Sequence, residues 1–301
     1  MPALSVIICA HNPRAEYLRQ TLAALEAQTL PREQWELLLV DNASREPLAA
    51  RWDLKWHPQA RHIREDELGL TPARLRGIRE AIGEVFVFVD DDNLLAPDYL
   101  QQATEIARGW PMLGAWGGRI VGRYETPPPA WATPYLGMLA IREFTGNRWS
   151  NSYDDGEARP CGAGMVVRRS VATVYASKVC TDPLRLGLGR KGASLVSCED
   201  SDLALTAIDL GLGVGMFDAM QLEHLIPAGR LEESYLLKLT ESMAFSGALL
   251  HSLRGPLRKP PLAKRIYDFV RMLALNSTSR HFELARRRGW NQAAGYLRRE
   301  P

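Results

Sequence analysis

The 301-residue sequence predicts an α/β protein with a mostly parallel, Rossmann-like sheet, helices on both faces and a helical C-terminal extension. Over the first 120 residues, short and fully apolar runs alternate with segments of helical spacing. Such unbroken runs are typical of strands that are buried on both faces of a parallel sheet. Two runs end in polar clusters, at Asp41 and Asp90. Because ligands bind at the carboxyl ends of such strands, both clusters are candidate site residues.

The expected elements of the first half follow in a regular order. Strands are predicted at residues 5–9, 37–40 and 85–89, with helices at 17–28 and 71–82 between them. The second helix opens at Thr71 and Pro72, and proline is well placed in a first helical turn. Strands that alternate with helices at this rhythm indicate a doubly wound sheet.

The second half of the chain has a less regular pattern. Residues 122–137 are expected to form an irregular, proline-rich loop, and residues 161–167 a small-residue turn that enters a strand. A helix is predicted at 201–210, closed by Gly211, and a short strand at 214–217. Helical spacing dominates after Leu231, so we expect a main domain over 1–230, an extension over 231–301 and a hinge at 254–261.

The composition is that of a folded protein, with 46% apolar and 24% charged residues. No apolar stretch approaches the length of a transmembrane helix, and the first residues do not resemble a signal peptide. The cysteines share no CxxC spacing, which argues against a zinc site and favours a reducing compartment. We therefore expect a cytosolic protein.

The formal net charge of +2 is unevenly distributed. Residues 254–301 hold twelve Lys or Arg against three acids, a net +9, which leaves −7 for residues 1–253. A basic tail favours a polyanionic neighbour, either nucleic acid or an anionic membrane surface. A solvated or packed helix face explains the same pattern. The apolar positions of the tail that follow helical spacing are Ile266, Phe269, Val270 and Leu273.

Three consecutive carboxylates, Asp90, Asp91 and Asp92, follow the third predicted strand. Like charges this close raise one another's pKa unless a cation or hydrogen-bond donors compensate them. A solvated turn that ends the strand is one interpretation. We favour a site for Mg²⁺ or Mn²⁺, since these ions prefer carboxylate oxygen. Two enzyme classes place acids in this way, namely dehalogenase-type phosphatases and nucleotide-sugar glycosyltransferases with a DxD motif.

The other motifs favour the second class, because residues 4–231 resemble family 2 glycosyltransferases of the GT-A fold. Residues 5–12 are similar to that family's first strand and turn, and residues 39–44 to its VDNAS element. Residues 69–77 resemble GxxxARNxG, with Leu75 in place of the usual Asn. Residues 162–169 resemble the acceptor-side GAGxxxRR segment, and residues 198–203 the EDxDL element.

The resemblance implies a nucleotide-diphosphate-sugar donor, with UDP or dTDP as the nucleotide, and a divalent metal, Mn²⁺ or Mg²⁺. It implies Asp200, with Glu199 as the alternative, as the general base of an inverting transferase. Acids in a first helical turn also serve as caps, and a lone histidine such as His224 is equally well a core residue. The implied nucleotide-sugar-binding residues are Ala10, Asn12, Asp41, Arg74, Asp90, Asp91 and Gly164. The implied metal ligands are Asp90, Asp92 and His224.

We therefore expect a cytoplasmic glycosyltransferase of the hexosyltransferase type, with its GT-A catalytic domain over residues 1–230. A glycan or lipid-linked acceptor of cell-envelope polysaccharide synthesis is expected, because bacterial relatives often extend lipid-linked glycans. The basic tail would then hold the protein at the inner membrane face, with no nucleic acid partner, and a homodimer is left open. The alternatives are a dehalogenase-type phosphatase and a non-catalytic nucleotide-sugar-binding module.

Overall fold

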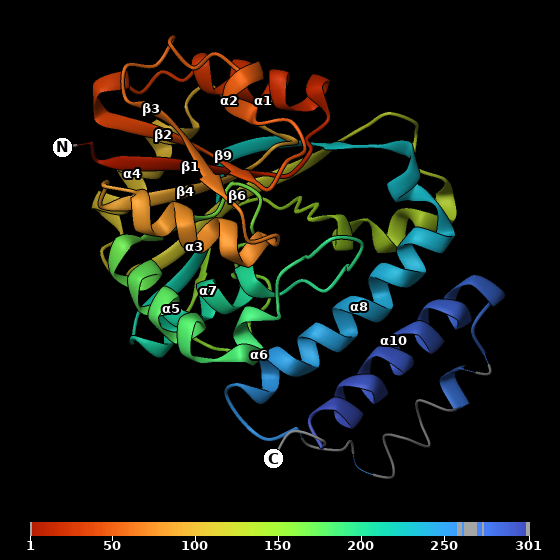
Figure 1. Ribbon diagram of the computed structural model, residues 1–301. Helices are drawn as coiled ribbons and strands as arrows, with labels where there is room; N and C mark the ends of the chain where they lie inside the picture. The colour runs from red at the N-terminus through yellow and green to blue at the C-terminus, as the bar shows by residue number, and fades with distance from the viewer. Residues whose placement is uncertain (1, 258–260, 262–269, 273, 299–301) are drawn as a thin grey trace.

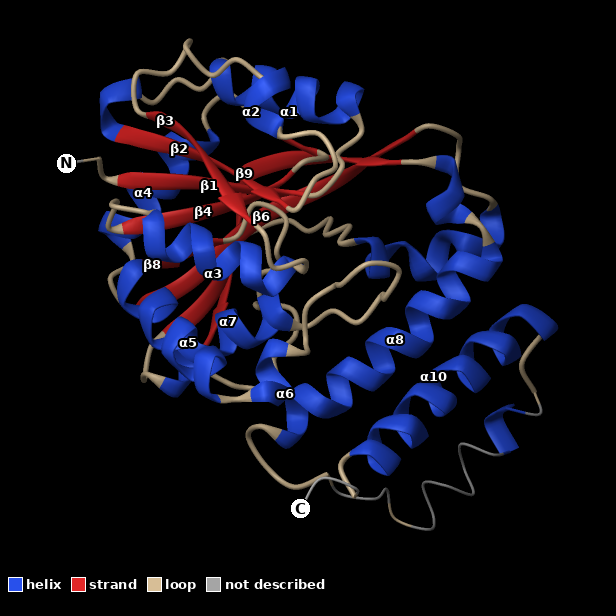
Figure 2. Ribbon diagram, viewed as in Figure 1, coloured by secondary structure: helices blue, strands red, loops and turns tan. Residues whose placement is uncertain are grey.

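A mixed sheet with helices on both faces forms the centre of the computed structural model, which describes residues 2–257, 261, 270–272 and 274–298 (Figures 1 and 2). The order of its strands is β3-β2-β1-β4-β8-β6-β9-β5, with β7 paired to β9. The first four strands of this order are parallel. They are β1 (Leu4–Ala10), β2 (Trp35–Asn42), β3 (Ala60–Glu65) and β4 (Val85–Asp90).

The other half of the sheet mixes strand directions. Strand β8 (Val166–Arg168) runs antiparallel between β4 and β6 (Leu113–Tyr124). Strand β9 (Gly213–Ile226) is parallel to β6, and β5 (Asn93–Leu95) is antiparallel to β9. The short β7 (Arg148–Ser150) pairs with the first residues of β9. This arrangement brings the ends of β4 and β9 to the same edge of the sheet.

The two faces of the sheet bury different helices. Alternate residues of β1 point to opposite cores, with Val6 and Ile8 in one and Ile7 in the other. Helices α1 (Ala15–Glu26) and α4 (Tyr99–Gly109) cover the first core, and α3 (Leu70–Glu80), α5 (Arg169–Thr181) and α7 (Glu199–Asp209) cover the second. The remaining short elements are η1 (Arg32–Gln34), α2 (Leu48–Arg51), η2 (Ala130–Leu139), α6 (Pro183–Leu186) and η3 (Ala228–Leu231).

Two long helices, α8 (Glu233–Ser252) and α10 (Ser277–Tyr296), lie side by side at the edge of the α/β body (Figure 1). Gly289 permits this close packing, because a Cβ there would lie 2.0 Å from the Glu241 carbonyl oxygen. Phe282 of α10 stacks on Tyr135 of η2, with ring centroids 3.6 Å apart. None of the described helices is both long and apolar enough to cross a bilayer.

Several sequence-based expectations differ from the structure. Strands β3, β5, β6 and β7 were not predicted, and β9 extends nine residues past the predicted end at Phe217. The loop expected at 122–137 is instead the end of β6 followed by the 3₁₀ turns of η2. Strand β6 was missed because glycines interrupt its apolar pattern. Gly118 is required where the register between β6 and β9 shifts, since a Cβ there would lie 2.1 Å from the Met220 carbonyl oxygen.

The C-terminal predictions are only partly covered by the structure. Ile266, Phe269, Leu273 and part of the hinge at 254–261 lie outside the described residues, whereas Val270 is described and exposed. The boundary at residue 230 stays a prediction. Helix α8 itself buries Ala248, Leu249 and Leu250 in the core shared with α7.

Candidate active site

A cavity of about 340 Å³ opens where the carboxyl ends of β1, β4 and β9 meet the start of α7. Loops after the strands, the first turn of α3, the end of η2 and two residues of α8 complete its walls. The predicted site residues that line it are Ala10, Arg74, Asp90, Asp91, Asp92, Glu199, Asp200 and His224. Asn12, Asp41 and Gly164 are not among its lining residues. Sequence motifs far apart in the chain therefore meet in one place.

The turn after β4 brings Asp92 to His224. Strand β5 begins directly after Asp92 and pairs Asn93 with His224 of β9. The Leu225 N–H donates to the Asp92 carbonyl at 2.9 Å, and the Asn93 amide donates to Asp92 Oδ1 at 3.1 Å. His224 was predicted to follow a short strand, whereas it lies within β9, because the strand resumes after a bulge and continues to Ile226.

Asp92 and His224 share a third partner that the sequence did not reveal. Asp92 Oδ2 lies 3.3 Å from His224 Nε2 and 3.2 Å from Arg230 Nη1 of η3. The same Arg230 nitrogen lies 3.3 Å from His224 Nε2. Asp92 and His224 are buried at this point. Arg230 lies six positions after His224 and belongs to no recognised motif, so nothing in the sequence indicated this contact.

The other two acids of the cluster have less compensation. Burial and the carboxylates of Asp92 and Asp90 raise the pKa of Asp91 to about 8. Burial also raises the pKa of Asp90, although Arg74, with Nη2 3.6 Å from Asp90 Oδ1, opposes the shift. Carboxylates crowded in this way favour a bound cation.

Arg74 connects this cluster to the start of α7. Its guanidinium is buried and donates from Nη1 to Glu199 Oε1 at 2.8 Å. Although burial opposes its charge, Glu199 and Asp90 raise the pKa of Arg74. Burial raises the pKa of Glu199 against the effect of Arg74. Glu199 is therefore held in an ion pair, and its second oxygen accepts from the Cys198 N–H at 3.2 Å.

Asp200 has a different environment from its neighbour. It is half-buried and lines the cavity, and no ion pair to it is present among the described residues. Its two oxygens accept from backbone N–H groups, of Gly162 at 2.7 Å and of Ser201 at 2.6 Å. These bonds orient the carboxylate without neutralising it. Asp200 is thus the better placed of the two acids to accept a proton.

The predicted nucleobase ligand Asp41 is buried beside the cavity. Arg64 lies 2.7 Å from Asp41 Oδ2, and the N–H groups of Ser44 and Leu48 donate to its two oxygens. Although burial favours the neutral acid, these bonds lower the pKa of Asp41. Asp41 therefore already has a structural use, which is to shape the turn after β2. Its contact with a base stays a prediction, as does that of Asn12, whose side chain accepts from the Arg45 N–H at 2.9 Å.

The small residues at 162–164 serve two purposes. A Cβ on Gly162 would lie 2.5 Å from Arg74 Nη2, so this glycine makes room for the buried guanidinium. Gly164 has a φ of +72° and accepts a 2.7 Å hydrogen bond from Tyr99 Oη through its carbonyl. Its predicted sugar contact stays a prediction, whereas Gly162 and Ala163 do line the cavity.

Comparison with known proteins gives a family for this arrangement. Residues 5–174, more than half of the chain, match the sequence model described as Glycosyl transferase family 2. The chain belongs to glycosyl transferase family 2. The match includes Arg74 and Asp90–Asp92 but ends before Glu199, Asp200 and His224.

Two curated relatives of the family carry partial similarity. The chain is 31% identical over 108 residues to the putative glycosyltransferase EpsH of Bacillus subtilis, covering 35% of this chain and 30% of the relative. It is 29% identical over 112 residues to the glycosyltransferase AglE of Haloferax volcanii, covering 36% of each. The chain therefore spans about a third of the length of these curated relatives.

Solved structures confirm the GT-A fold that the family resemblance implied. The mannosyltransferase PcManGT from Pyrobaculum calidifontis, in complex with GDP-Man and Mn²⁺, aligns over 98% of this chain and 74% of its own, with a TM-score of 0.56 and 22% identity. S. aureus TarS 1-349, in complex with UDP-GlcNAc, aligns over 86% and 68%, with a TM-score of 0.54 and 13% identity. At these identities the likeness supports the fold alone.

Among the residues that line the cavity, the three carboxylates of Asp90–Asp92 and the imidazole of His224 are ligand types that suit a hard divalent cation. The Leu139 carbonyl, 2.9 Å from His224 Nδ1, fixes the ring so that Nε2 faces Asp92. Within the described part of the chain, however, no three His, Cys, Asp or Glu side chains are grouped closely enough to hold a metal. Asp92 and His224 instead converge on Arg230.

Proposed function

We propose that this family 2 member transfers a sugar from a nucleotide-diphosphate donor to a hydroxyl acceptor with inversion, and that it uses a divalent metal. One observation carries the proposal: a single cavity holds a crowded acid cluster at Asp90–Asp92 and, on α7, a separate carboxylate, Asp200, that forms no ion pair with any residue the structure describes. Donor binding and proton removal are thereby assigned to different acids.

Asp200 is proposed as the general base. It would accept the proton of the acceptor hydroxyl as that oxygen bonds to the anomeric carbon, while the bond from that carbon to the diphosphate breaks. The departing diphosphate keeps the electron pair. Gly162 and Ser201 hold the Asp200 carboxylate in place through their N–H groups. Glu199 is the weaker candidate, because its carboxylate is paired with Arg74.

Asp92 and His224, with Asp90 close by, are proposed to hold the metal. When bound, a divalent cation would supply positive charge for the donor diphosphate. Arg190 lines the same cavity and would add to that charge. Arg74 has a positioning role, since it joins Asp90 to Glu199 and so connects the donor side to α7. For Asp90 to bind the metal, its carboxylate must reach the ion while it stays near Arg74.

The donor and the acceptor are proposed as classes of molecule. UDP and dTDP sugars are the expected donors, and GDP sugars are added because PcManGT was solved with GDP-Man. A glycan or lipid-linked acceptor, a cytoplasmic location and membrane attachment through the tail are proposed from the sequence. Of the tail's helical apolar positions, only Val270 is described, and it is exposed.

The test is a panel of UDP-, dTDP- and GDP-sugars, scored by thermal stabilisation and by nucleotide release with Mn²⁺, with Mg²⁺ and with EDTA. We expect one nucleotide class to stabilise the protein and to turn over only with metal. Asp92→Asn should abolish both metal-dependent effects and leave the fold intact. Undiminished turnover in EDTA would contradict the metal, and binding without turnover with any acceptor would favour a non-catalytic module.

A further inference from the structure

The position between Asp92 and His224 already holds a cationic group. Asp92 Oδ2 and His224 Nε2 lie 3.3 Å apart, and Arg230 Nη1 lies 3.2 Å from the first and 3.3 Å from the second. The three atoms therefore form a nearly equilateral triangle. A guanidinium nitrogen lies where the two side chains converge.

The hydrogen bonding of His224 makes that position an acceptor site. The Leu139 carbonyl can only accept, so His224 Nδ1, at 2.9 Å from it, carries the hydrogen. In the neutral ring Nε2 is then an acceptor, and it faces the carboxylate oxygen Asp92 Oδ2. Two acceptors at this separation are stabilised by a cation or a donor that contacts both of them, and Arg230 Nη1 is such a group.

The two acceptors are fixed, whereas the guanidinium is the more accessible group. The Asp92 carbonyl accepts from Leu225, the Oδ1 atom accepts from Asn93, and His224 lies inside β9. The exposed fractions of the Asp92 and His224 side chains are 8% and 7%, against 27% for Arg230. Arg230 belongs to a single 3₁₀ turn, η3, between β9 and α8. Movement at this site is therefore expected from Arg230.

We propose that Arg230 is a resident counter-ion that competes with the metal for Asp92 and His224, and that it releases them when a nucleotide diphosphate enters. This inference rests on the proposed function, because it takes Asp92 and His224 as metal ligands. Metal and guanidinium cannot occupy one position at once. The diphosphate offers Arg230 another anionic partner, so nucleotide binding favours metal binding, and by linkage the reverse holds. Arg230 thereby makes binding of the two ligands cooperative.

The experiment measures Mn²⁺ affinity, from the free-ion EPR signal or by calorimetry, without nucleotide and with UDP or GDP. In the unmodified chain we expect weak Mn²⁺ binding that strengthens with nucleotide. Arg230→Met should strengthen binding of Mn²⁺ alone about tenfold or more and should reduce the further gain from nucleotide. Arg190→Met is the matched control, since it removes an equal charge from the same cavity without touching Asp92 Oδ2.

The outcomes separate this inference from the proposed function. Unchanged Mn²⁺ affinity in Arg230→Met would overturn the competition, and so would an equal gain in Arg190→Met, which would indicate a general charge effect. If Mn²⁺ binding is nevertheless lost in Asp92→Asn, the proposed metal site survives either result. If no protein binds Mn²⁺ with or without nucleotide, both proposals fail. Circular dichroism and thermal melting of each variant show whether it is folded.

Discussion

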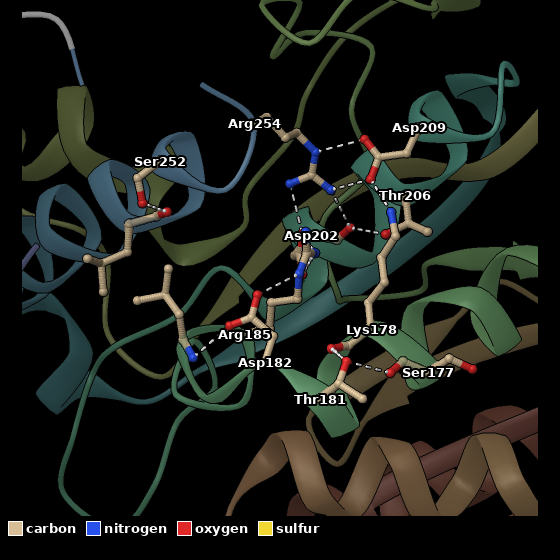
Figure 3. Close-up of polar contacts among 12 residues, drawn as sticks. Ser177, Lys178, Thr181, Asp182, Arg185, Asp202, Thr206, Asp209, Ser252 and Arg254 are labelled. Carbon is tan, nitrogen blue, oxygen red and sulfur yellow. Dashed lines mark hydrogen bonds and ion pairs between the residues drawn. The ribbon is translucent and has the colours of Figure 1, made fainter. Parts of the chain in front are cut away.

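The acids of helix α7 have two kinds of surroundings. Asp202 and Asp209 do not line the cavity, and arginine and lysine neutralise both of them (Figure 3). Asp202 is fully buried, with both oxygens 2.6 Å from Arg185 Nη1 and one oxygen 2.8 Å from Arg254 Nη1. Asp209 lies 2.7 Å from Lys178 and 3.0 Å from Arg254. This network joins α5, α6 and α7 to the residues that follow α8.

Asp200 of the same helix accepts from two backbone N–H groups and forms no ion pair within the described part of the chain. The cavity beside it contains an aspartate, Asp91, whose pKa is raised to about 8. Only Ser201 separates Asp200 from Asp202, yet Asp200 lines the cavity and Asp202 pairs with two arginines. On α7, Asp202 and Asp209 join parts of the fold through the cations that contact them, whereas the Asp200 carboxylate faces the cavity and stays available to a ligand.

The largest expected effect is on kcat and comes from Asp200, the α7 aspartate that lines the cavity. Asp200→Asn should lower kcat by roughly two to four powers of ten, because general acid–base catalysis is of that size. The donor affinity should change little, whereas the melting temperature should fall modestly, because the amide oxygen keeps one of the two backbone N–H donors and the amide NH2 faces the other. Steady-state kinetics with the donor found in the nucleotide panel, together with thermal melting, measures both.

Glu199→Gln is the matched control for that variant. The change removes the charge that faces Arg74 and should affect stability more than Asp200→Asn does. A crippled Glu199→Gln enzyme beside a nearly active Asp200→Asn enzyme would reverse the assignment of the base.

The second effect is on stability and concerns the ion pairs of Asp202. Asp202→Asn leaves Arg185 and Arg254 without their shared carboxylate, and breaking a buried ion pair in this way costs about 3–5 kcal/mol. Denaturant unfolding should show this loss in the free energy of unfolding. A triple variant, Asp202→Leu with Arg185→Met and Arg254→Met, should be less destabilised than the single variant, since it leaves no charge uncompensated. Equal losses in both would show that the pairing is unimportant.

The smallest effect is a pH dependence at Asp209. Although burial opposes it, hydrogen bonds from Arg254 and Lys178 lower the pKa of Asp209 below 3.8. Its stabilisation is therefore complete above pH 3.8 and is lost as the pH falls through the lower folded pKa. The melting temperature of Asp209→Asn should lie below that of the unmodified chain by a constant amount from about pH 5 to 8, and the gap should close in stronger acid. A gap that is unchanged below pH 3 would show that Asp209 does not titrate as described.

The sequence predicted the parallel half of the fold well, because fully apolar strands leave a clear pattern. The runs that became β1, β2 and β4 each end near the predicted residues. Asp90 is the last residue of β4, and Asp91 and Asp92 follow it. The pattern failed at β3, whose sequence ARHIRE is mostly polar, and at β6, which is interrupted by glycines. Strand propensity and the periodicity of apolar residues do not predict strands of these two kinds.

For the site, the sequence identified the acids but could not give their partners. Nothing in the element from Cys198 to Leu203 shows that Asp202 pairs with arginines 17 residues before and 52 residues after it. The same holds for Arg230, whose position beside Asp92 depends on the pairing of β5 with β9. Such contacts arise from the tertiary fold, and a single sequence does not encode them in local spacing.

The stacking of Phe282 on Tyr135 has a consequence for the diversification of this chain. The 3₁₀ turns that carry Tyr135 also supply Met138 and Leu139 to the cavity wall. Substitutions on α10 can therefore reshape that wall while every acid of the cavity stays in place. Under the proposed function, we expect this arrangement to separate the selection of partner molecules from the chemistry, so that each can evolve at its own rate. Protein engineers could use the same separation by grafting the α8 and α10 pair from one relative onto another.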